Sequence, residues 1–267
     1  MKKKYFRNKT ILITGSSSGL GKEFAIQLSK FEQNLNLILV ARRKERLEEL
    51  KTNLLDNGLN TVTIISQDLT EQDGPEKIFK KVESLQQNVD ILINNAGFAL
   101  SDEFDSLGLQ EYMNMVDLNI KAVIKLIYLF LPVMKNKKSG AILNVSSILG
   151  ALPTPDLAVY SGTKAFILSF SEALWKELKR YNIRVTTLVS VGIETEFFNK
   201  VHKNKFRYLP IQKPEKVAKK ALNALGKKKR LAYTGNRYAF LLHSKRLLPQ
   251  RLIIWMMDIF YDEKKRF

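Results

Sequence analysis

The stretch "VYSGTKAF" places Tyr160 and Lys164 four residues apart in a segment suited to an amphipathic helix. Side chains at this spacing share one helix face, so the lysine ammonium can lie near the tyrosine phenol. A free phenol has a pKa of about 10, and a neighbouring cation lowers that value by stabilising the phenolate. The pair therefore predicts a general acid or base at Tyr160. Spacing alone leaves open that the pair is only a structural helix face.

A glycine-rich stretch, "TGSSSGLG", lies between an apolar strand pattern and a helix pattern. Gly15 would permit a tight turn, and backbone N–H groups of Ser16–Gly19 could then approach a pyrophosphate. Gly21 would let the helix pack closely on the strand. This context predicts dinucleotide binding, and the alternative is a glycine-rich turn without a ligand.

Two arginines follow the second predicted strand in "VARRKER". A carboxylate at this place would accept hydrogen bonds from the adenosine ribose of NAD, whereas the guanidinium groups of Arg42 and Arg43 match a 2′-phosphate. The sequence therefore predicts NADP(H) in preference to NAD(H). The alternative is that both arginines are solvated residues at the start of a helix.

Six short runs rich in β-branched residues and leucine alternate with helix patterns, which is typical of a parallel sheet. Each run is apolar on both faces, as a strand covered by helices on both sides must be. We therefore predict an α/β fold with a doubly wound parallel sheet and helices on both faces. The predicted strands are 10–15, 36–42, 61–68, 89–97, 140–147 and 183–190, and the helices include 21–31, 43–55 and 109–134.

Three further motifs complete the pattern: "NNAG" at 94–97, "DLNI" at 117–120 and "NVSS" at 144–147. Together with the glycine loop and the Tyr160 segment, in this order, they make residues 8–199 resemble the short-chain dehydrogenase/reductase family. The resemblance implies a Rossmann-type fold. It also implies a single NAD(P)-binding domain over residues 1–267, with its core at about 8–199 and a substrate-covering extension at about 200–267.

The resemblance assigns roles to the polar residues of these motifs. Tyr160 would donate a proton to a substrate carbonyl as hydride arrives from the nicotinamide, and Lys164 would also hold the nicotinamide ribose. Ser147 would hydrogen-bond the carbonyl oxygen, because the family's usual spacing before the tyrosine selects it, with Ser146 in reserve. Asn119 would position a water beside the lysine.

The resemblance also implies a set of cofactor contacts. Asp68 would meet the adenine amino group, and the Asn94–Gly97 segment would pass the adenosine ribose while it braces the sheet. Thr195 would meet the nicotinamide carboxamide, although Val191 stands where the family usually has proline, and we expect a less ordered loop there. The full set is Gly15, Ser16, Ser17, Ser18, Gly19, Leu20, Gly21, Arg42, Arg43, Asp68, Leu69, Asn95, Ala96, Gly97, Tyr160, Lys164, Ile193 and Thr195.

Composition excludes several other chemistries. The chain has no cysteine, so disulfides, thiolate catalysis and zinc–thiolate sites are excluded, and two isolated histidines, His202 and His243, predict no metal site. The N-terminal apolar run is short and leads into the glycine loop, unlike a signal peptide. We expect a cytoplasmic protein, either free or peripheral to a membrane.

The last quarter of the chain carries most of the positive charge. Residues 200–267 hold 19 lysines and arginines against four acidic residues, which is +15 of the total +18. Within this basic, apolar extension, "LIIWMMDIFY" (252–261) predicts a helix of about 15 Å, too short to span a bilayer. It could pack on the domain or a second subunit, lie on an anionic membrane surface, or dock an acidic acyl carrier. No nucleic-acid motif is present.

Taken together, these features predict an NADP(H)-dependent oxidoreductase that reduces a ketone or aldehyde to an alcohol, with Tyr160 as general acid. The apolar extension predicts a hydrophobic or lipid-like substrate. The apolar segment 119–134 predicts a homo-dimer or tetramer. The alternative function is a non-catalytic NADP(H)-binding redox sensor or membrane-associated scaffold, although both Tyr160 and Lys164 are retained.

Overall fold

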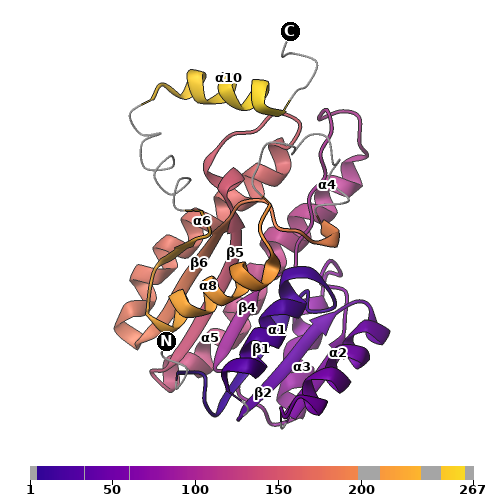
Figure 1. The fold of residues 1–267 in the computed structure, drawn as a ribbon, viewed down its shortest axis with the longest axis vertical. Coiled ribbons are helices and arrows are strands. Elements are labelled where there is room, and N and C mark those ends of the chain that lie inside the picture. The colour runs from indigo at the N-terminus through magenta and orange to yellow at the C-terminus, as the bar shows by residue number, and fades with distance from the viewer. Residues whose placement is uncertain (1–4, 33, 60, 198–210, 236–247, 262–267) are drawn as a thin grey trace.

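A computed structural model describes residues 5–32, 34–59, 61–197, 211–235 and 248–261. These residues form one sheet of seven parallel strands in the order β3-β2-β1-β4-β5-β6-β7 (Figure 1). The predicted doubly wound sheet is therefore confirmed. The strands are β1 (Lys9–Thr14), β2 (Leu35–Ala41), β3 (Thr61–Ser66), β4 (Ile91–Asn94), β5 (Gly140–Ser147), β6 (Ile183–Ser190) and β7 (Leu231–Tyr233).

Helices cover both faces of the sheet because successive strand side chains point to opposite sides. In β1, Ile11 and Ile13 enter one apolar core, whereas Leu12 enters the other, and all three are fully buried. Figure 1 shows α1 and α8 in front of the sheet. The first core includes α1 (Gly19–Phe31), α2 (Lys44–Asp56) and α8 (Pro214–Gly226), and the second includes α3 (Gly74–Ser84), α5 (Ala122–Asn136) and α6 (Ala158–Leu178).

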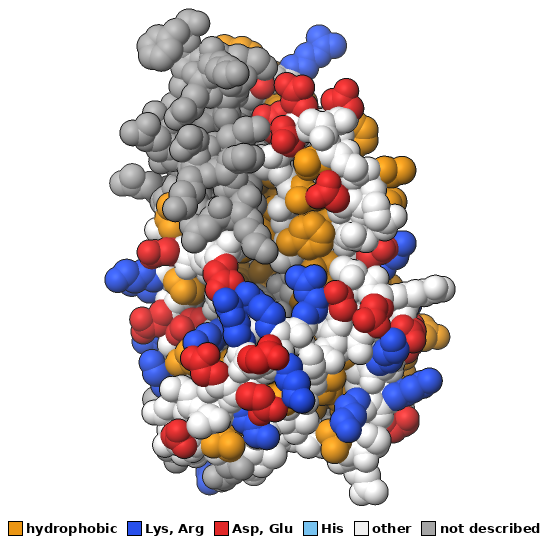
Figure 2. Space-filling model, turned by 90° about the vertical axis from the view of Figure 1, so that its right-hand side faces the viewer, with side chains coloured by type: hydrophobic (Ala, Val, Ile, Leu, Met, Phe, Trp, Pro, Cys, Tyr) orange, Lys and Arg blue, Asp and Glu red, His pale blue; other side chains and the backbone are white. Residues whose placement is uncertain are grey.

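The carboxyl ends of the strands meet at one edge of the sheet. β1 pairs with β2 on one side and with β4 on the other, both in parallel. Successive strands are therefore added outward in one direction up to β3 and in the opposite direction from β4 onward. Ligands of doubly wound proteins bind in the crevice at such a switch point. A third apolar cluster, which includes Tyr160, lies at this end. Figure 2 shows hydrophobic side chains gathered in a strip in the upper half of one face, with acidic and basic side chains intermixed below it.

The long helix predicted at 109–134 is interrupted in the structure. It consists of α4 (Leu109–Val116), a π-helical turn at Asp117–Lys121 and α5. A π turn inserts an extra residue into the helical hydrogen-bonding pattern and is frequent at functional sites. Here the turn contains Asn119, whose side chain is buried against the backbone of another segment. Periodicity could not predict the turn, because apolar spacing continues on both sides of it.

The seventh strand is absent from our prediction. After helix α8, β7 pairs in parallel with β6, so this part of the basic extension belongs to the sheet. The Arg184 guanidinium donates to the carbonyl oxygens of Leu225 and Gly226, at 3.3 and 3.0 Å, and so stabilises the end of α8. A three-residue strand directly after a basic run has too short an apolar pattern to be recognised.

The predicted apolar helix near the C-terminus is α10 (Gln250–Tyr261). Ile253 and Met257 are buried in the third apolar cluster, so this helix packs against the domain. Its outer side keeps Leu252 and Trp255 exposed, at 39% and 60%. Between α10 and the outer side of α6 lies a cavity of about 490 Å³ lined mainly by apolar and small residues. Among the described residues, no helix is both long and apolar enough to span a membrane.

Candidate active site

Tyr160 and Lys164 occupy the first two turns of α6 and are almost fully buried. The Lys164 ammonium lies 5.7 Å from the centre of the Tyr160 ring, and it donates a hydrogen bond of 3.1 Å to the Val145 carbonyl oxygen. The helix spacing therefore brings the two side chains together as predicted. Residues on β5 and α6, far apart in sequence, form the pocket that holds the lysine.

The structure distinguishes the two serines at the end of β5. The Ser146 hydroxyl donates to the Lys164 carbonyl oxygen at 2.8 Å, so it ties β5 to α6. The Ser147 hydroxyl interacts with Tyr160 and accepts the Leu149 N–H at 3.2 Å. A hydroxyl beside the phenol can also hydrogen-bond an oxygen that the phenol protonates. The geometry supports Ser147, rather than Ser146, as the candidate catalytic serine.

Asn119 is 1% exposed and links the π turn to the segment after β4. Its side-chain amide donates to the Phe98 carbonyl oxygen at 2.9 Å and to the Thr163 hydroxyl at 3.1 Å, and its oxygen accepts the Phe98 N–H. Thr163 precedes Lys164, so Asn119 contacts the helix that carries the catalytic pair. The predicted water beside Lys164 stays a prediction.

The predicted direction of the Tyr160 pKa is wrong for this structure. Burial raises the pKa of the phenol above its ordinary value, and the interaction with Ser147 opposes that rise only in part. Burial also lowers the pKa of Lys164 to about 8. Both shifts disfavour the charged forms, because the surroundings are apolar. Sequence spacing predicted the attraction between the two groups but not the cost of removing them from water.

The glycine loop has the shape expected of a dinucleotide site. Gly15 has a φ of +68°, which favours glycine, and a Cβ on Gly21 would lie 2.2 Å from the Gly15 carbonyl oxygen. α1 begins at Gly19, within this glycine-rich stretch, so its first N–H groups point toward the crevice. Ser16 is buried and its hydroxyl donates to the Val40 carbonyl oxygen, so it fixes the loop to β2. The loop fits a bound pyrophosphate.

The segment after β4 braces this loop. The Asn95 amide donates to the Thr14 carbonyl oxygen at 2.9 Å, and the Thr14 hydroxyl accepts the N–H groups of Asn95 and Ala96 at 3.0 Å each. Asn94 bonds Asn144 on β5 at 2.8 Å. The predicted bracing role of this motif is therefore confirmed, and its contact with a ribose stays a prediction.

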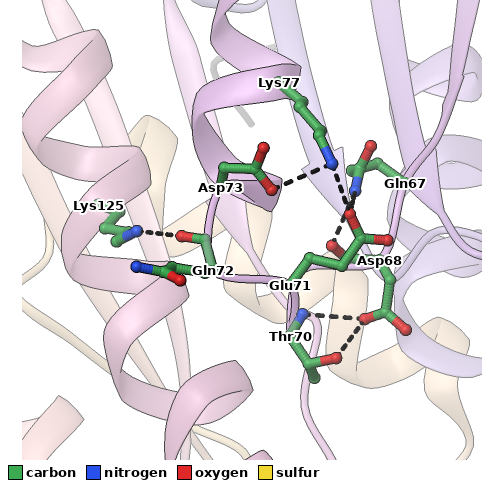
Figure 3. A network of polar contacts seen from close by, with 8 residues as sticks. All are labelled: Gln67, Asp68, Thr70, Glu71, Gln72, Asp73, Lys77 and Lys125. Carbon is green, nitrogen blue, oxygen red and sulfur yellow. Dashed lines mark hydrogen bonds and ion pairs between the residues drawn. The ribbon is translucent and has the colours of Figure 1, made fainter.

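Asp68 begins a polar network after β3 (Figure 3). Its carboxylate accepts the N–H and hydroxyl of Thr70 at 2.9 and 2.8 Å. Burial alone would raise the pKa of Asp68, but these bonds and the nearby Arg42 lower it. Lys77 and Lys125 tie the following loop to α3 and α5. An ionised, positioned carboxylate at this place fits a bond from an adenine amino group.

The remaining predicted cofactor residues fall into two groups. The side chains of Leu20 and Leu69 are buried in the two apolar cores. Only the backbone groups of these two residues are therefore candidates for contact with a cofactor. Arg42 pairs with Asp68 at 3.5 Å and its side chain is 68% exposed. Arg43 lies against the glycine loop and donates to the Ser17 and Ser18 hydroxyls, at 2.6–3.2 Å.

The loop after β6 closes the crevice from the other side. The Val191 N–H donates to the Thr234 hydroxyl at 3.3 Å, a bond that proline could not make. Ile193 forms a bridge with Gln212, and the Thr195 hydroxyl donates to the Ile193 carbonyl oxygen. Phe197, which sequence analysis did not single out, packs its ring 6.0 Å from that of Tyr160. Its signal was only an aromatic residue beside a recognised motif.

Comparison with known proteins decides the family. The family model described as short chain dehydrogenase matches residues 9–205. The chain belongs to that family. This dehydrogenase is 33% identical over 190 residues to an uncharacterized oxidoreductase of Staphylococcus epidermidis, covering 71% of this chain and 80% of that one. It is 34% identical over 221 residues to a very-long-chain 3-oxoacyl-CoA reductase of Coccidioides immitis, covering 81% of this chain but only 61% of the fungal protein.

A solved structure extends the similarity to three dimensions. The short-chain dehydrogenase from Sphingobium yanoikuyae, solved in complex with NADPH, has 27% identity and a TM-score of 0.80, covering 90% of this chain and 94% of that chain. This protein is thus an oxidoreductase on a nicotinamide-binding fold. Within its described residues, no three acidic or histidine side chains gather to hold a metal ion. His202 and His243 lie outside those residues.

The buried lysine makes the stability of this dehydrogenase depend on pH. Between about pH 8 and 9.5, Lys164 loses its proton in the folded state but keeps it in the unfolded state. The folded state then binds fewer protons, so the free energy of unfolding rises with pH, by about 1 to 2 kcal/mol over that range. Tyr160 opposes this rise slightly near pH 9.5, because burial raises its pKa in the folded state and the unfolded phenol therefore begins to lose its proton first.

We therefore expect Lys164→Met to abolish this rise, as measured by urea unfolding from pH 7.5 to 9.5. Lys176→Met removes an exposed lysine from the same helix and should leave the rise intact. An identical pH dependence in all three proteins would show that Lys164 keeps its ordinary pKa.

Proposed function

We propose that this dehydrogenase is an NADPH-dependent reductase of hydrophobic ketones or aldehydes. The observation that carries the proposal is the placement of the Tyr160 phenol against Ser147, with the Lys164 ammonium beside its ring, at the carboxyl edge of a dinucleotide-binding sheet. That arrangement supplies a proton donor and a hydrogen-bond donor next to the crevice where a nicotinamide would lie.

The protein residues divide the reaction between them. Ser147 would orient the substrate by donating a hydrogen bond to its carbonyl oxygen. Bound NADPH would supply the hydride to the carbonyl carbon. Tyr160 would transfer its proton to the oxygen as negative charge develops there, and the product is the alcohol. A phenol is protonated at neutral pH because its ordinary pKa is about 10, and burial raises the pKa of Tyr160 further, so the proton is present for transfer.

Lys164 would stabilise the phenolate that remains after proton transfer. Its pKa of about 8 keeps most of the ammonium charged at neutral pH, while leaving it able to exchange a proton. The apolar surroundings strengthen this attraction, since little water competes for either charge. The same burial that raises the phenol pKa therefore makes the lysine a more effective partner once the phenolate forms.

The surroundings of Tyr160 support a hydrophobic substrate. The cluster that contains its ring also contains Leu149, Leu152, Val191 and Met257, so the protein walls beside the phenol are apolar. Relatives point in the same direction: one is named as a very-long-chain 3-oxoacyl-CoA reductase, and another, 33% identical over 187 residues, as the human 17-beta-hydroxysteroid dehydrogenase type 3. Both names refer to bulky apolar substrates.

The arginines after β2 support NADP(H). Arg43 reaches the glycine loop, and Arg42 stands beside it with most of its side chain exposed. Guanidinium groups at this position can pair with a 2′-phosphate, which NAD(H) lacks.

Turnover measured against carbonyl compounds of increasing chain length tests the reductase. We expect NADPH oxidation to rise with the length of the apolar chain. Tyr160→Phe should lower turnover by about 10³-fold or more, because it removes the general acid and the phenolate. NADPH binding, followed by cofactor fluorescence, should change little.

Tyr181→Phe is the matched control and should retain activity, because Tyr181 packs against Lys135 and Arg180, away from the crevice. Tight NADPH binding without turnover of any carbonyl would contradict the reductase and favour a redox sensor.

We also propose that the dehydrogenase forms a homo-oligomer through α5 and α6. Ile124 and Tyr128 lie one helical turn apart on α5 and are 38% and 77% exposed. On α6, Phe166 is 36% exposed and stacks on Phe170 with ring centres 5.5 Å apart. Exposed apolar residues gathered on two long helices are typical of a subunit interface.

Light scattering should therefore give a mass of at least two chains for the wild type. Tyr128→Glu should lower the mass toward one chain, because it places a charge in the apolar contact. Phe104→Glu is the control, since it changes another exposed aromatic residue that lies on a different segment. A monomeric wild-type protein at micromolar concentration would refute the interface.

We further propose that α10 lies against an anionic membrane surface. Leu248, Leu252 and Trp255 are all exposed and follow helical spacing, and Arg251 is exposed beside them. An acidic carrier protein would use the basic charge of residues 200–267 but has no need of this apolar stripe. Tryptophan and leucine beside basic residues suit the lipid interface.

Sedimentation with phosphatidylserine-containing vesicles should bring down the wild-type protein at low salt and less of it at high salt. Trp255→Glu should weaken binding several-fold, whereas Leu109→Glu, which charges an exposed leucine on α4, should not. Sedimentation unaffected by Trp255→Glu would show that α10 is not the contact.

A further inference from the structure

Arg43 already has an acceptor for each of its three side-chain nitrogens. Nε and Nη2 donate to the hydroxyls of Ser17 and Ser18, and Nη1 donates to the Glu196 carboxylate at 2.9 Å. Four of its five N–H groups are thus engaged, so a phosphate that pairs with this guanidinium through two N–H groups must displace an existing partner. The hydroxyls are neutral and belong to the glycine loop, whereas Glu196 is an anion that comes from the far side of the crevice.

Glu196 is shared between two arginines. Its second carboxylate oxygen accepts a hydrogen bond from Nη1 of Arg46, one turn further along α2, at 2.5 Å. The two arginines lower the pKa of Glu196, so it is ionised at neutral pH. A carboxylate held between two guanidinium groups occupies the kind of site that also suits a phosphate.

The neighbours of Glu196 place it at the mouth of the crevice. Thr195 lies directly over the glycine loop, where a Cβ on Gly19 would be 3.0 Å from its methyl group. On the other side, Phe197 packs against the Tyr160 ring. The contacts of Thr195 and Phe197 position the backbone of Glu196 between them. From this position the Glu196 carboxylate bonds Arg43 and Arg46.

We propose that Glu196 is a cofactor-specificity residue, whose carboxylate competes with the 2′-phosphate of NADP(H) for Arg43 and Arg46. This inference rests on the proposed binding of a nicotinamide dinucleotide in the crevice. A phosphate that pairs with Arg43 through two N–H groups must displace Glu196 or a serine hydroxyl, and the Glu196 carboxylate also repels it, so part of the attraction between phosphate and arginines is lost. NAD(H) presents a neutral 2′-hydroxyl, which leaves the ion pairs intact.

The competition narrows the preference for NADP(H) that the arginines alone would give. In many dinucleotide-binding proteins a carboxylate at the end of the second strand accepts the ribose hydroxyl of NAD. Here that strand ends in arginines, and a carboxylate reaches the same place from the loop after β6, 153 residues away along the chain. The Glu196 carboxylate therefore lies close to the place of the usual strand-end carboxylate, although it comes from a different part of the sequence.

Affinities of Glu196→Gln for NADPH and NADH, measured by fluorescence titration in low salt, test the inference. Glutamine has the same shape without the charge. We expect the dissociation constant for NADPH to fall about three- to tenfold, the effect of removing exposed ion pairs that oppose binding, while that for NADH changes less than twofold. The gain should shrink as salt is added, because exposed charges are screened.

Glu194→Gln is the matched control. It removes the same charge from an exposed residue of the same loop, whose N–H bonds the Gln212 carbonyl oxygen at 3.0 Å. Its NADPH affinity should stay at the wild-type value if position, rather than overall charge, matters. Equal gains in the two variants, or no gain in Glu196→Gln, would overturn the inference.

The same titration separates this inference from the proposed cofactor preference. A wild-type protein that prefers NADH refutes the preference for NADP(H), yet a selective gain in NADPH affinity in Glu196→Gln would still establish the competition. Conversely, a wild-type preference for NADPH that Glu196→Gln leaves unchanged would keep the proposed preference and refute the role of Glu196.

Discussion

All seven strands of the described sheet run in the same direction, and this constraint places every functional group at one edge. Parallel strands need crossover helices on both faces, so both faces are filled by apolar cores and no face is left for a ligand. The remaining open place is the edge where the strands end and the connecting loops begin. Four groups lie at or just after the end of a strand: the glycine loop, Asp68, the Asn95 segment and Ser147. They therefore come together in the fold although they are far apart in sequence.

Burial at that edge shifts the pKa values of the candidate catalytic pair, Tyr160 and Lys164. Tyr160 and Lys164 are close enough to attract each other once charged, but each loses water on entering the fold. Desolvation disfavours the charged form of each group. It raises the pKa of the Tyr160 phenol and lowers the pKa of the Lys164 ammonium. An acid must be protonated before it reacts, and its conjugate base must be stabilised afterwards. One apolar environment meets both needs, because it penalises an isolated charge and strengthens a pair of opposite charges.

Local patterns predicted the features that depend on neighbours in sequence. The six strand runs, the loop before α1 and the i, i+4 placement of Tyr160 and Lys164 are each contained in fewer than ten residues, and the structure has them where expected. The features that sequence did not reveal depend on distant contacts. The π turn forms where Asn119 reaches Phe98, β7 forms only by pairing with β6, and the ion pair of Arg43 with Glu196 joins segments 153 residues apart. No short-range pattern carries that information.

The positive charge of the chain is distributed unevenly between the crevice and the C-terminal part. At the end of β2 most of the basic charge is compensated: Arg42 pairs with Asp68, and Arg43 and Arg46 share Glu196, so three arginines face two carboxylates. The large positive excess lies instead in residues 200–267, which hold +15. Partly compensated charges attract anions only weakly from a distance, so the proposed discrimination between cofactors would depend on exchange of partners at contact range. The proposed attraction to an anionic membrane surface would arise instead in residues 200–267, where basic residues have few acidic neighbours in sequence.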